Sequence, residues 1–322
     1  MHEEKYADLI WDHDEAAYKK FIENLAPIVL FTYNRLEHTQ KTIEALKQNV
    51  YAGDSELYIY SDGPKNEEAK ESVAAVRSFL RQVDGFKQVH IIERDKNWGL
   101  AENIIDGVTS IVNKYGKIIV LEDDIVTSKY FLKYMNDALE VYKNEDRVME
   151  INGYMPKIKK EGIPETFFLE YADCWGWATW ARAWEYFRRE PDAIRVSFTK
   201  DEIYKFNLNG ADDGRWDQIV ANCDGRLYTW AIFWDVAIFK NHGLSLMVRD
   251  SLVDNNGMDG SGEHCSTMGD FKTIINNEPI LEYPLTIKEN KFARRNFENF
   301  FRRLKPSKWQ RFKNKIKSLL GM

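Results

Sequence analysis

Three consecutive acids, Glu122, Asp123 and Asp124, follow the apolar run at 118–121 and precede a second apolar pair at 125–126. Neighbouring carboxylates repel one another, and burying them without a positive partner is costly or raises their pKa values. Mg²⁺ and Mn²⁺ take oxygen ligands, often only one or two protein carboxylates together with substrate phosphates. The acids therefore indicate a divalent cation that arrives with a nucleotide diphosphate. The alternative is a solvated turn in which Asp123 or Asp124 caps the next helix.

The elements that position these acids alternate between apolar runs and amphipathic stretches. The expected strands lie at 27–33, 56–63, 88–94 and 117–124. The expected helices lie at 34–49, 66–82, 99–116 and 129–145, after a peripheral helical segment at 1–25. This alternation predicts an α/β fold with a Rossmann-like, mostly parallel sheet flanked by helices. The strands are apolar throughout, as expected when both faces of a sheet are covered.

Polar residues follow each of the four expected strands. They are the segments 32–35, 62–63, 94–95 and 122–124. In parallel sheets, ligands bind beyond the carboxyl ends of the strands, so these segments predict one ligand crevice. No GxGxxG follows the first strand and no GxxxxGK[ST] occurs, which argues against a dinucleotide-binding fold and a phosphate-loop NTPase.

The second half of the sequence has a different character. From about residue 150 the pattern is irregular and rich in Trp, Gly and Asp, with no flexible linker before it. We expect one domain at 26–287, with a nucleotide-binding half at 26–150 and an acceptor half at 151–287. A basic amphipathic tail follows at 288–322.

Charge and composition narrow the possible functions. The tail carries twelve Lys and Arg against two Glu, a net of +10, which leaves −16 on the remaining residues. A basic amphipathic helix is typical of a membrane surface, with a helix packed on the domain as the alternative. The acidic body argues against nucleic acid as a partner. Three widely spaced cysteines, no signal peptide and no apolar run of 18 residues predict a cytoplasmic protein, with peripheral attachment to the inner face of the membrane.

Five motifs occur in an order and spacing that resemble a known family. They are PIVLFTYNR, YSDGPKNEE, DKNWGLAENI, VLEDD and CWGWATWARAW, and the resemblance spans roughly 27–265. Together they resemble the GT-A nucleotide-sugar glycosyltransferases, and more narrowly the bacterial sugar transferases related to N-acetylglucosaminyltransferase I. In that family the acidic motif is DxD or its EDD form.

The resemblance implies a role for each matching residue. Those assigned to the nucleotide are Thr32, Asn34, Arg35, Asp62, Asn97 and Leu100. Asp62 would bind uracil or another base, and Glu122 and Asp123 would face the ribose, the sugar or metal-bound water. Asp124 would ligate Mn²⁺ or Mg²⁺ directly. The floor of the donor-sugar and acceptor site would be Trp175, Gly176 and Trp177, for which core packing is the alternative.

The catalytic base is the point where the sequence departs from the family pattern. The relatives carry a WDDW motif, but TWAIFW at 229–234 has Ala231 and Ile232 at those positions. The available acids are Asp217 and Asp235, and we favour Asp217 because the nearby Asp212 and Asp213 would raise its pKa. The segment 255–265 resembles the family's closing lid, in which His264 would touch a phosphate or the metal, or be structural.

These residues predict a metal-dependent, inverting glycosyltransferase of bacterial surface polysaccharide synthesis. Its donor would be a nucleotide-diphosphate sugar, in the first place a UDP-sugar carrying a hexosyl or N-acetylhexosaminyl group, and its acceptor a glycan or a lipid-linked glycan. The alternatives are a nucleotidyltransferase that makes a nucleotide sugar, and a noncatalytic glycan- or nucleotide-binding protein. A nucleotidyltransferase would need a Gly-rich basic loop after the first strand, which FTYNRLEH does not provide.

Overall fold

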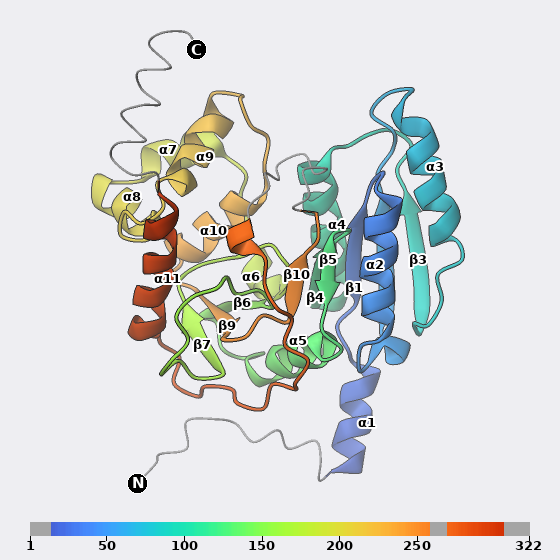
Figure 1. The fold of residues 1–322 in the computed structure, drawn as a ribbon, viewed down its shortest axis with the longest axis horizontal. Coiled ribbons are helices and arrows are strands. Elements are labelled where there is room, and N and C mark those ends of the chain that lie inside the picture. The colour runs from blue at the N-terminus through green and yellow to red at the C-terminus, as the bar shows by residue number, and fades with distance from the viewer. Residues whose placement is uncertain (1–13, 258–268, 306–322) are drawn as a thin grey trace.

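An eight-stranded sheet runs through both halves of the chain in the computed structural model, which describes residues 14–257 and 269–305 (Figure 1). Its strands are β1 (Ile28–Thr32), β2 (Glu56–Ser61), β3 (Gln88–Glu93), β4 (Lys117–Glu122), β6 (Val148–Asn152), β7 (Thr166–Leu169), β8 (Trp177–Trp180) and β9 (Leu244–Val248). A separate antiparallel pair joins β5 (Ile125–Thr127) to β10 (Val253–Asn255).

The strand order is β3-β2-β1-β4-β8-β6-β9-β7. The first four of these strands are parallel to one another, as the sequence predicts. Strand β8 lies antiparallel between β4 and β6, whereas β6 and β9 are parallel and β7 closes the far edge antiparallel. The predicted GT-A-like α/β fold is therefore confirmed, with a mixed rather than parallel second half.

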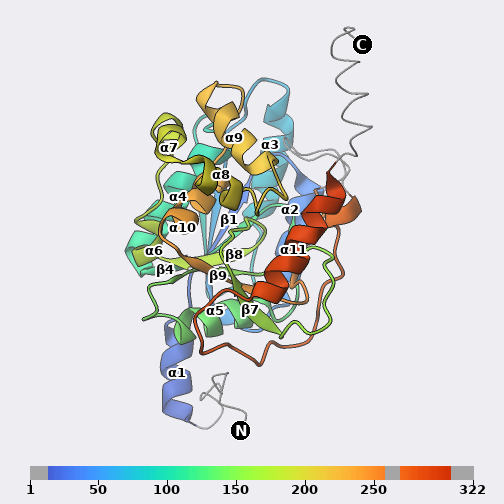
Figure 2. The ribbon, with the colours of Figure 1, turned by 90° about the vertical axis from the view of Figure 1, so that its left-hand side faces the viewer.

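Helices α2 (Leu36–Lys47) and α3 (Ala69–Leu80) cover one face of the first half, and α4 (Leu100–Tyr115) covers the other (Figures 1 and 2). Strand β1 shows why both faces need a cover. Ile28 and Leu30 belong to the core under α2 and α3, while Val29 and Phe31 belong to the core under α4. Because successive side chains of a strand point to opposite faces, a fully apolar strand must be covered twice.

The predicted helices of the first half all form, including α5 (Phe131–Val141). Helix α2 turns Thr39, Ile43 and Leu46 into the core at the spacing that the sequence shows. Gly116 ends α4 with a φ of 79°, a backbone conformation that favours glycine.

Between residues 151 and 257 the structure has five short helices that the sequence does not mark clearly. They are α6 (Ala181–Trp184), α7 (Pro191–Ser197), α8 (Lys200–Phe206), α9 (Gly214–Cys223) and α10 (Ala231–Lys240). Helix α10 is apolar and buried on nearly all sides, so it lacks a helical period in its hydrophobicity. Short 3-10 turns occur at Ala52–Asp54 and Gly269–Phe271.

Helices α1 and α11 differ in how many apolar side chains they bury. Helix α1 (Glu15–Glu23) begins at an Asp14 cap and buries Phe21. Helix α11 (Lys291–Leu304) buries Ala293, Phe297 and Phe300 against the core. The apolar face that was predicted to meet a membrane is thus covered by the protein over this helix. The part of the tail after Lys305 lies outside the described residues.

Across 14–257 and 269–305, no helix combines the length and the apolar character needed to cross a membrane.

Candidate functional site

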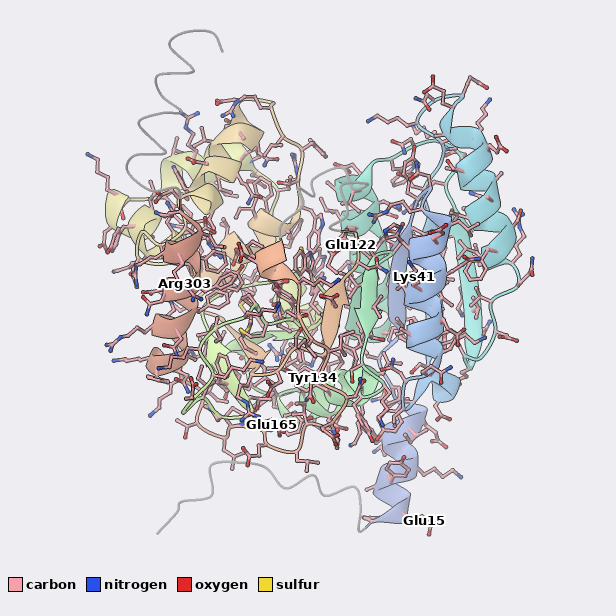
Figure 3. All side chains as sticks on the ribbon, viewed as in Figure 1. Glu15, Lys41, Glu122, Tyr134, Glu165 and Arg303 are labelled. Atoms are coloured by element: carbon pink, nitrogen blue, oxygen red, sulfur yellow. The ribbon has the colours of Figure 1, made fainter. Side chains whose placement is uncertain are left out.

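The acidic residues lie where β4 ends and the chain turns into β5, and Glu122 is the last residue of β4 (Figure 3). Asp123 and Asp124 are each 5% exposed, and Glu122 is partly buried. Arg35, from the loop after β1, contacts both Asp123 and Asp124. Its Nη2 donates to Oδ1 of Asp123 and, at 2.8 Å, to Oδ2 of Asp124. The chain therefore supplies one positive partner itself, from a residue that was predicted to bind the nucleotide.

One guanidinium does not neutralise three carboxylates. Burial, with the charges of Asp124 and Asp123, raises the pKa of Glu122 to about 8. Burial also raises the pKa of Asp123 to about 6, although Arg35 opposes this shift. An additional cation would relieve both effects, so the cluster has the charge expected of a site for a divalent ion.

The pair of strands β5 and β10 brings a second segment onto the acids. The N–H of Asn256 donates to the carbonyl of Asp124 at 2.9 Å. A Cβ on Gly257 would lie 2.2 Å from Oδ2 of Asp124 and 2.8 Å from Nη1 of Arg35, so only glycine fits there. Among the described residues, Nη1 of Arg35 and both side-chain polar atoms of Asn256 are buried without a hydrogen-bond partner. Buried polar atoms left open beside a charge cluster are expected where a ligand is bound.

No three His, Cys, Asp or Glu side chains within the described ranges are grouped as ligands of a single metal ion. This arrangement still fits a Mg²⁺ or Mn²⁺ that one or two carboxylates hold together with substrate phosphates. Asp124 and Asp123 are the residues that would hold it. His264, the other predicted contact, lies outside the described residues.

Asp62 organises the neighbouring strand end. Its carboxylate accepts the N–H groups of Gly63 and Trp98 at 2.8 Å and of Gly99 at 2.9 Å. It also accepts the side-chain amide of Asn97 at 3.1 Å. These bonds hold the loop that starts α4, where backbone N–H groups can meet an anion. Asp62 and Asn97 are thus together, as predicted, although much of the Asp62 carboxylate is taken up by the loop.

The remaining residues predicted to bind the nucleotide differ in accessibility. Thr32 is buried, and its hydroxyl donates to the carbonyl of Tyr60 at 3.4 Å. Asn34 is partly buried in the loop between β1 and α2. Leu100 is 36% exposed as the first residue of α4. Asn34 and Leu100 therefore have exposed surface for a ligand, and the buried Thr32 supports the strand end.

The CWGW motif contributes one partly open aromatic residue and one buried one. Trp175 is partly buried and stands edge-on to Tyr154, with ring centroids 4.5 Å apart. Gly176 has a φ of 70°, and a Cβ there would lie 3.0 Å from Val253. Trp177 has no exposed surface and packs among Trp184, Trp230 and Trp234. The side chain of Trp177 thus has the core role that was its alternative, and it presents no surface to a ligand.

The two predicted bases lie in different surroundings. Asp217 is exposed on α9. Asp235, on α10, is buried and pairs with Nη2 of Arg215 at 2.7 Å, and it also accepts the N–H of Ala172 at 2.8 Å. A buried acid with a dedicated partner of this kind is held in place by it, which suits a structural role better than proton transfer.

A further acid, Asp173, was not among the predicted residues. It is partly buried directly before the CWGW motif, and burial raises its pKa to about 7. Its N–H donates to Oε1 of Glu150 at 3.2 Å, and Glu150 is itself fully buried and accepts the indole N–H of Trp234 at 2.6 Å. The signal in the sequence was an acid adjoining a recognised motif, but burial was needed to distinguish it from the other acids of the second half.

Comparisons with known proteins agree with this architecture. The model of glycosyl transferase family 2 matches residues 28–196, more than half of the chain. No curated protein sequence gives a match.

Two solved structures give remote similarities. TarS of S. aureus aligns with a TM-score of 0.31 and 14% identity, over 46% of this chain and 24% of that chain. The mannosyltransferase PcManGT from Pyrobaculum calidifontis, solved in complex with GDP-Man and Mn²⁺, aligns with a TM-score of 0.37 and 10% identity. That alignment covers 70% of this chain and 75% of the mannosyltransferase, whereas this chain spans only about a quarter of TarS. At these scores neither structure bears on what this chain binds.

Proposed function

Because the chain belongs to glycosyl transferase family 2, and is thus a nucleotide-sugar glycosyltransferase, we propose that it transfers a hexosyl or N-acetylhexosaminyl group from a UDP-sugar, with Mn²⁺ or Mg²⁺ and with inversion. The acceptor in this proposal is a glycan or lipid-linked glycan of bacterial surface polysaccharide synthesis, as in the sugar transferases related to N-acetylglucosaminyltransferase I. The nucleotide would be bound by the half at 26–150 and the acceptor by the half at 151–287.

The observation that carries the proposal is the unneutralised acidic cluster at the end of β4. Two of its three acids, Asp123 and Asp124, share the guanidinium of Arg35, and polar atoms of Arg35 and Asn256 beside them are buried without partners in the described part of the chain. A divalent cation bound to a diphosphate would add positive charge for the acids and phosphate oxygens for the donors. When bound, such an ion stabilises the charge of the departing diphosphate.

The residues of this chain supply the remaining requirements. Asp62 holds the loop from Asn97 to Leu100 in place, so that the donor base and ribose would meet a preformed surface. Gly257 lets its segment lie directly against Asp124 and Arg35, where a larger residue would clash with both side chains. We assign recognition of the nucleotide to these contacts.

Calorimetric titration with UDP, GDP, TDP and CMP, each with and without Mn²⁺, tests the proposal. We expect one nucleotide to bind only in the presence of Mn²⁺, and Asp124→Ala to weaken that binding about 100-fold or more, because the variant loses the carboxylate that would hold the metal on which the diphosphate depends. Asp54→Ala, an exposed acid in a surface turn, is the matched control and should bind as wild type does. Binding of no nucleotide, or binding indifferent to Mn²⁺ and to Asp124, would contradict the proposal.

We further propose a cytoplasmic location with peripheral attachment to anionic membrane through the basic tail. Its support in the described residues is the outer face of α11, where Lys291, Arg295 and Arg303 are exposed and Phe292 is 47% exposed. Co-sedimentation with vesicles of anionic lipid, compared with neutral vesicles, tests this. Equal binding to both, or none to either, would count against attachment by basic charge.

A further inference from the structure

Asp173 lies on the same edge of the sheet as the acidic cluster. Strand β8 pairs antiparallel with β4, and Val120 is opposite Trp177. The residues just before Trp177 therefore run beside Leu121 and Glu122, the last two residues of β4. On the other side, the N–H of Gly153, after β6, donates to the carbonyl of Gly176 at 2.9 Å. The approach to β8 is thus fixed between two strand ends.

Electrostatic interactions within the loop agree with this register. The pKa of the Cys174 thiol is raised by burial and then by the charges of four carboxylates, those of Glu122, Asp173, Glu150 and Asp124. Acids from β4, from the turn after it, from β6 and from the loop before β8 are therefore close enough to one thiol to raise its pKa. Asp173 is on the acceptor-half side of this group.

The carboxylate of Asp173 is held at one oxygen. Its Oδ1 accepts the N–H of Trp175 at 2.9 Å, and its own N–H donates to Glu150. Its second oxygen has no hydrogen bond to any described residue, in contrast to Asp235, whose two oxygens are both engaged. An oriented carboxylate with one free oxygen, beside the partly open ring of Trp175, is suited to accept a proton.

The charged groups around Asp173 set the protonation of this acid. Burial raises its pKa to about 7, Asp235 on α10 adds to the shift, and Arg215 on α9 and the N–H of Trp175 oppose it. The neighbouring Glu150 has its own pKa raised well above the ordinary value by burial, so it adds little negative charge at neutral pH. A base that ionises near neutral pH combines a useful fraction of carboxylate with a useful proton affinity.

We propose that Asp173 is the catalytic base that takes the proton of the attacking hydroxyl, an inference that rests on the glycosyl transfer proposed above. In the step, the hydroxyl oxygen of the acceptor forms a bond to the anomeric carbon of the donor sugar. The bond from that carbon to the diphosphate oxygen breaks, and its electron pair leaves with the nucleoside diphosphate. The hydroxyl proton passes to the free oxygen of Asp173, and water removes it before the next turnover. Asp235 remains with Arg215, and Asp217 stays on the outside of α9.

The test uses hydrolysis of the nucleotide sugar, in which water replaces the unidentified acceptor. UDP-glucose, UDP-galactose, UDP-N-acetylglucosamine and GDP-mannose are incubated with the full-length enzyme and Mn²⁺, and the release of nucleoside diphosphate is followed from pH 5 to 9. Asp173→Asn is compared with wild type, because its side-chain oxygen can still accept the N–H of Trp175. Asp173→Glu is the conservative variant, and Asp201→Asn, an exposed acid on α8, is the matched control. Calorimetry with the matching nucleoside diphosphate measures donor-site binding in every variant.

We expect kcat to fall about 100-fold or more in Asp173→Asn while diphosphate binding stays within about twofold, since a general base contributes about 10² to 10⁴. Wild-type kcat/KM should rise with pH through an apparent pKa near 7, and this limb should be absent from the residual activity of Asp173→Asn. Asp173→Glu should recover part of the rate and of the limb. A variant Asp173→Asn that hydrolyses at the wild-type rate, or keeps the acid limb, overturns the assignment while the proposed function stands. Failure of wild type to bind and hydrolyse any of the four donors overturns both.

Discussion

Buried acidic side chains differ between the two halves of the molecule in the positive partners that they have. In the first half, Asp123 and Asp124 share the single guanidinium of Arg35, and Glu122 adjoins them as the last residue of β4. In the second half, Asp235 is equally buried and pairs with Arg215 at 2.7 Å, and that guanidinium lies 4.6 Å from the centroid of the Tyr171 ring. Unmatched buried charge is relieved by a bound cation or by protonation, whereas a matched buried charge becomes costly only when its partner is removed. The difference separates the candidate binding residues from structural ones more sharply than residue type does.

The largest effect should come from breaking the matched pair. Arg215→Met leaves Asp235 buried without its partner, and we expect it to lower the free energy of unfolding by about 3 to 5 kcal/mol. Urea denaturation followed by circular dichroism measures this. The double variant Arg215→Met with Asp235→Leu should regain most of the loss, because it removes the charge that was left alone. A double variant no more stable than the single one would contradict the view that the pair is matched.

Crowding the unmatched cluster should have a smaller effect, and on binding more than on folding. Gly257→Ala would place a methyl group 2.2 Å from Oδ2 of Asp124, so the loop must shift at a cost of about 1 to 3 kcal/mol. We expect the Mn²⁺-dependent affinity for the nucleoside diphosphate to fall about tenfold in calorimetric titration. Gly53→Ala is the matched control, since nothing lies within 4 Å of its added Cβ. Equal affinities for the two variants would argue that the segment does not border the ligand.

The smallest expected effect is on how the free energy of unfolding of the metal-free protein depends on pH. The folded-state pKa of Glu122, about 8, lies above its ordinary value of 4.5. Between these values the folded chain holds a proton that the unfolded chain has released, so the free energy of unfolding falls as pH rises through this window. Glu122→Gln should flatten the decline, most clearly above pH 6, where Asp123 no longer contributes. Urea denaturation in a chelator at several pH values measures the slope, and identical slopes for variant and wild type would show that Glu122 is neutralised in another way.

The first half of the fold could be predicted from the sequence because each of its elements has a clear local pattern of apolar residues. Strand β1 is apolar throughout, α2 repeats its apolar residues every three or four positions, and Gly116 marks the end of α4. Helix α10 gives no such signal, since it is buried on nearly all sides. The short strands of the second half pair with partners far away in the sequence, which local patterns do not reveal.

In the candidate site, too, some residues could be predicted from the sequence and others could not. Asp62 and the acids at 122–124 were predicted to lie together because parallel strands end at one edge, and the register sets the ends of β2 and β4 on either side of the end of β1. Asn97, whose role the family resemblance implied, donates to Asp62. The partner of the acids, Arg35, was predicted to be near but not to bridge them. Asp173 could not be chosen in advance, because its position depends on the antiparallel insertion of β8 and its pKa on burial.

The insertion of β8 also has a consequence during synthesis of the chain. Strand β4 pairs on one side with β1, and its other side is covered only by β8, which begins at Trp177. A ribosome-bound chain whose first 150 residues have left the ribosome thus carries the four parallel strands with an open, apolar edge at Ile118 to Val120. Such an edge is a template for pairing with another chain. Fragments that stop before Trp177 are therefore expected to aggregate, although they contain every strand of the first half, and fragments for study should extend beyond Trp180.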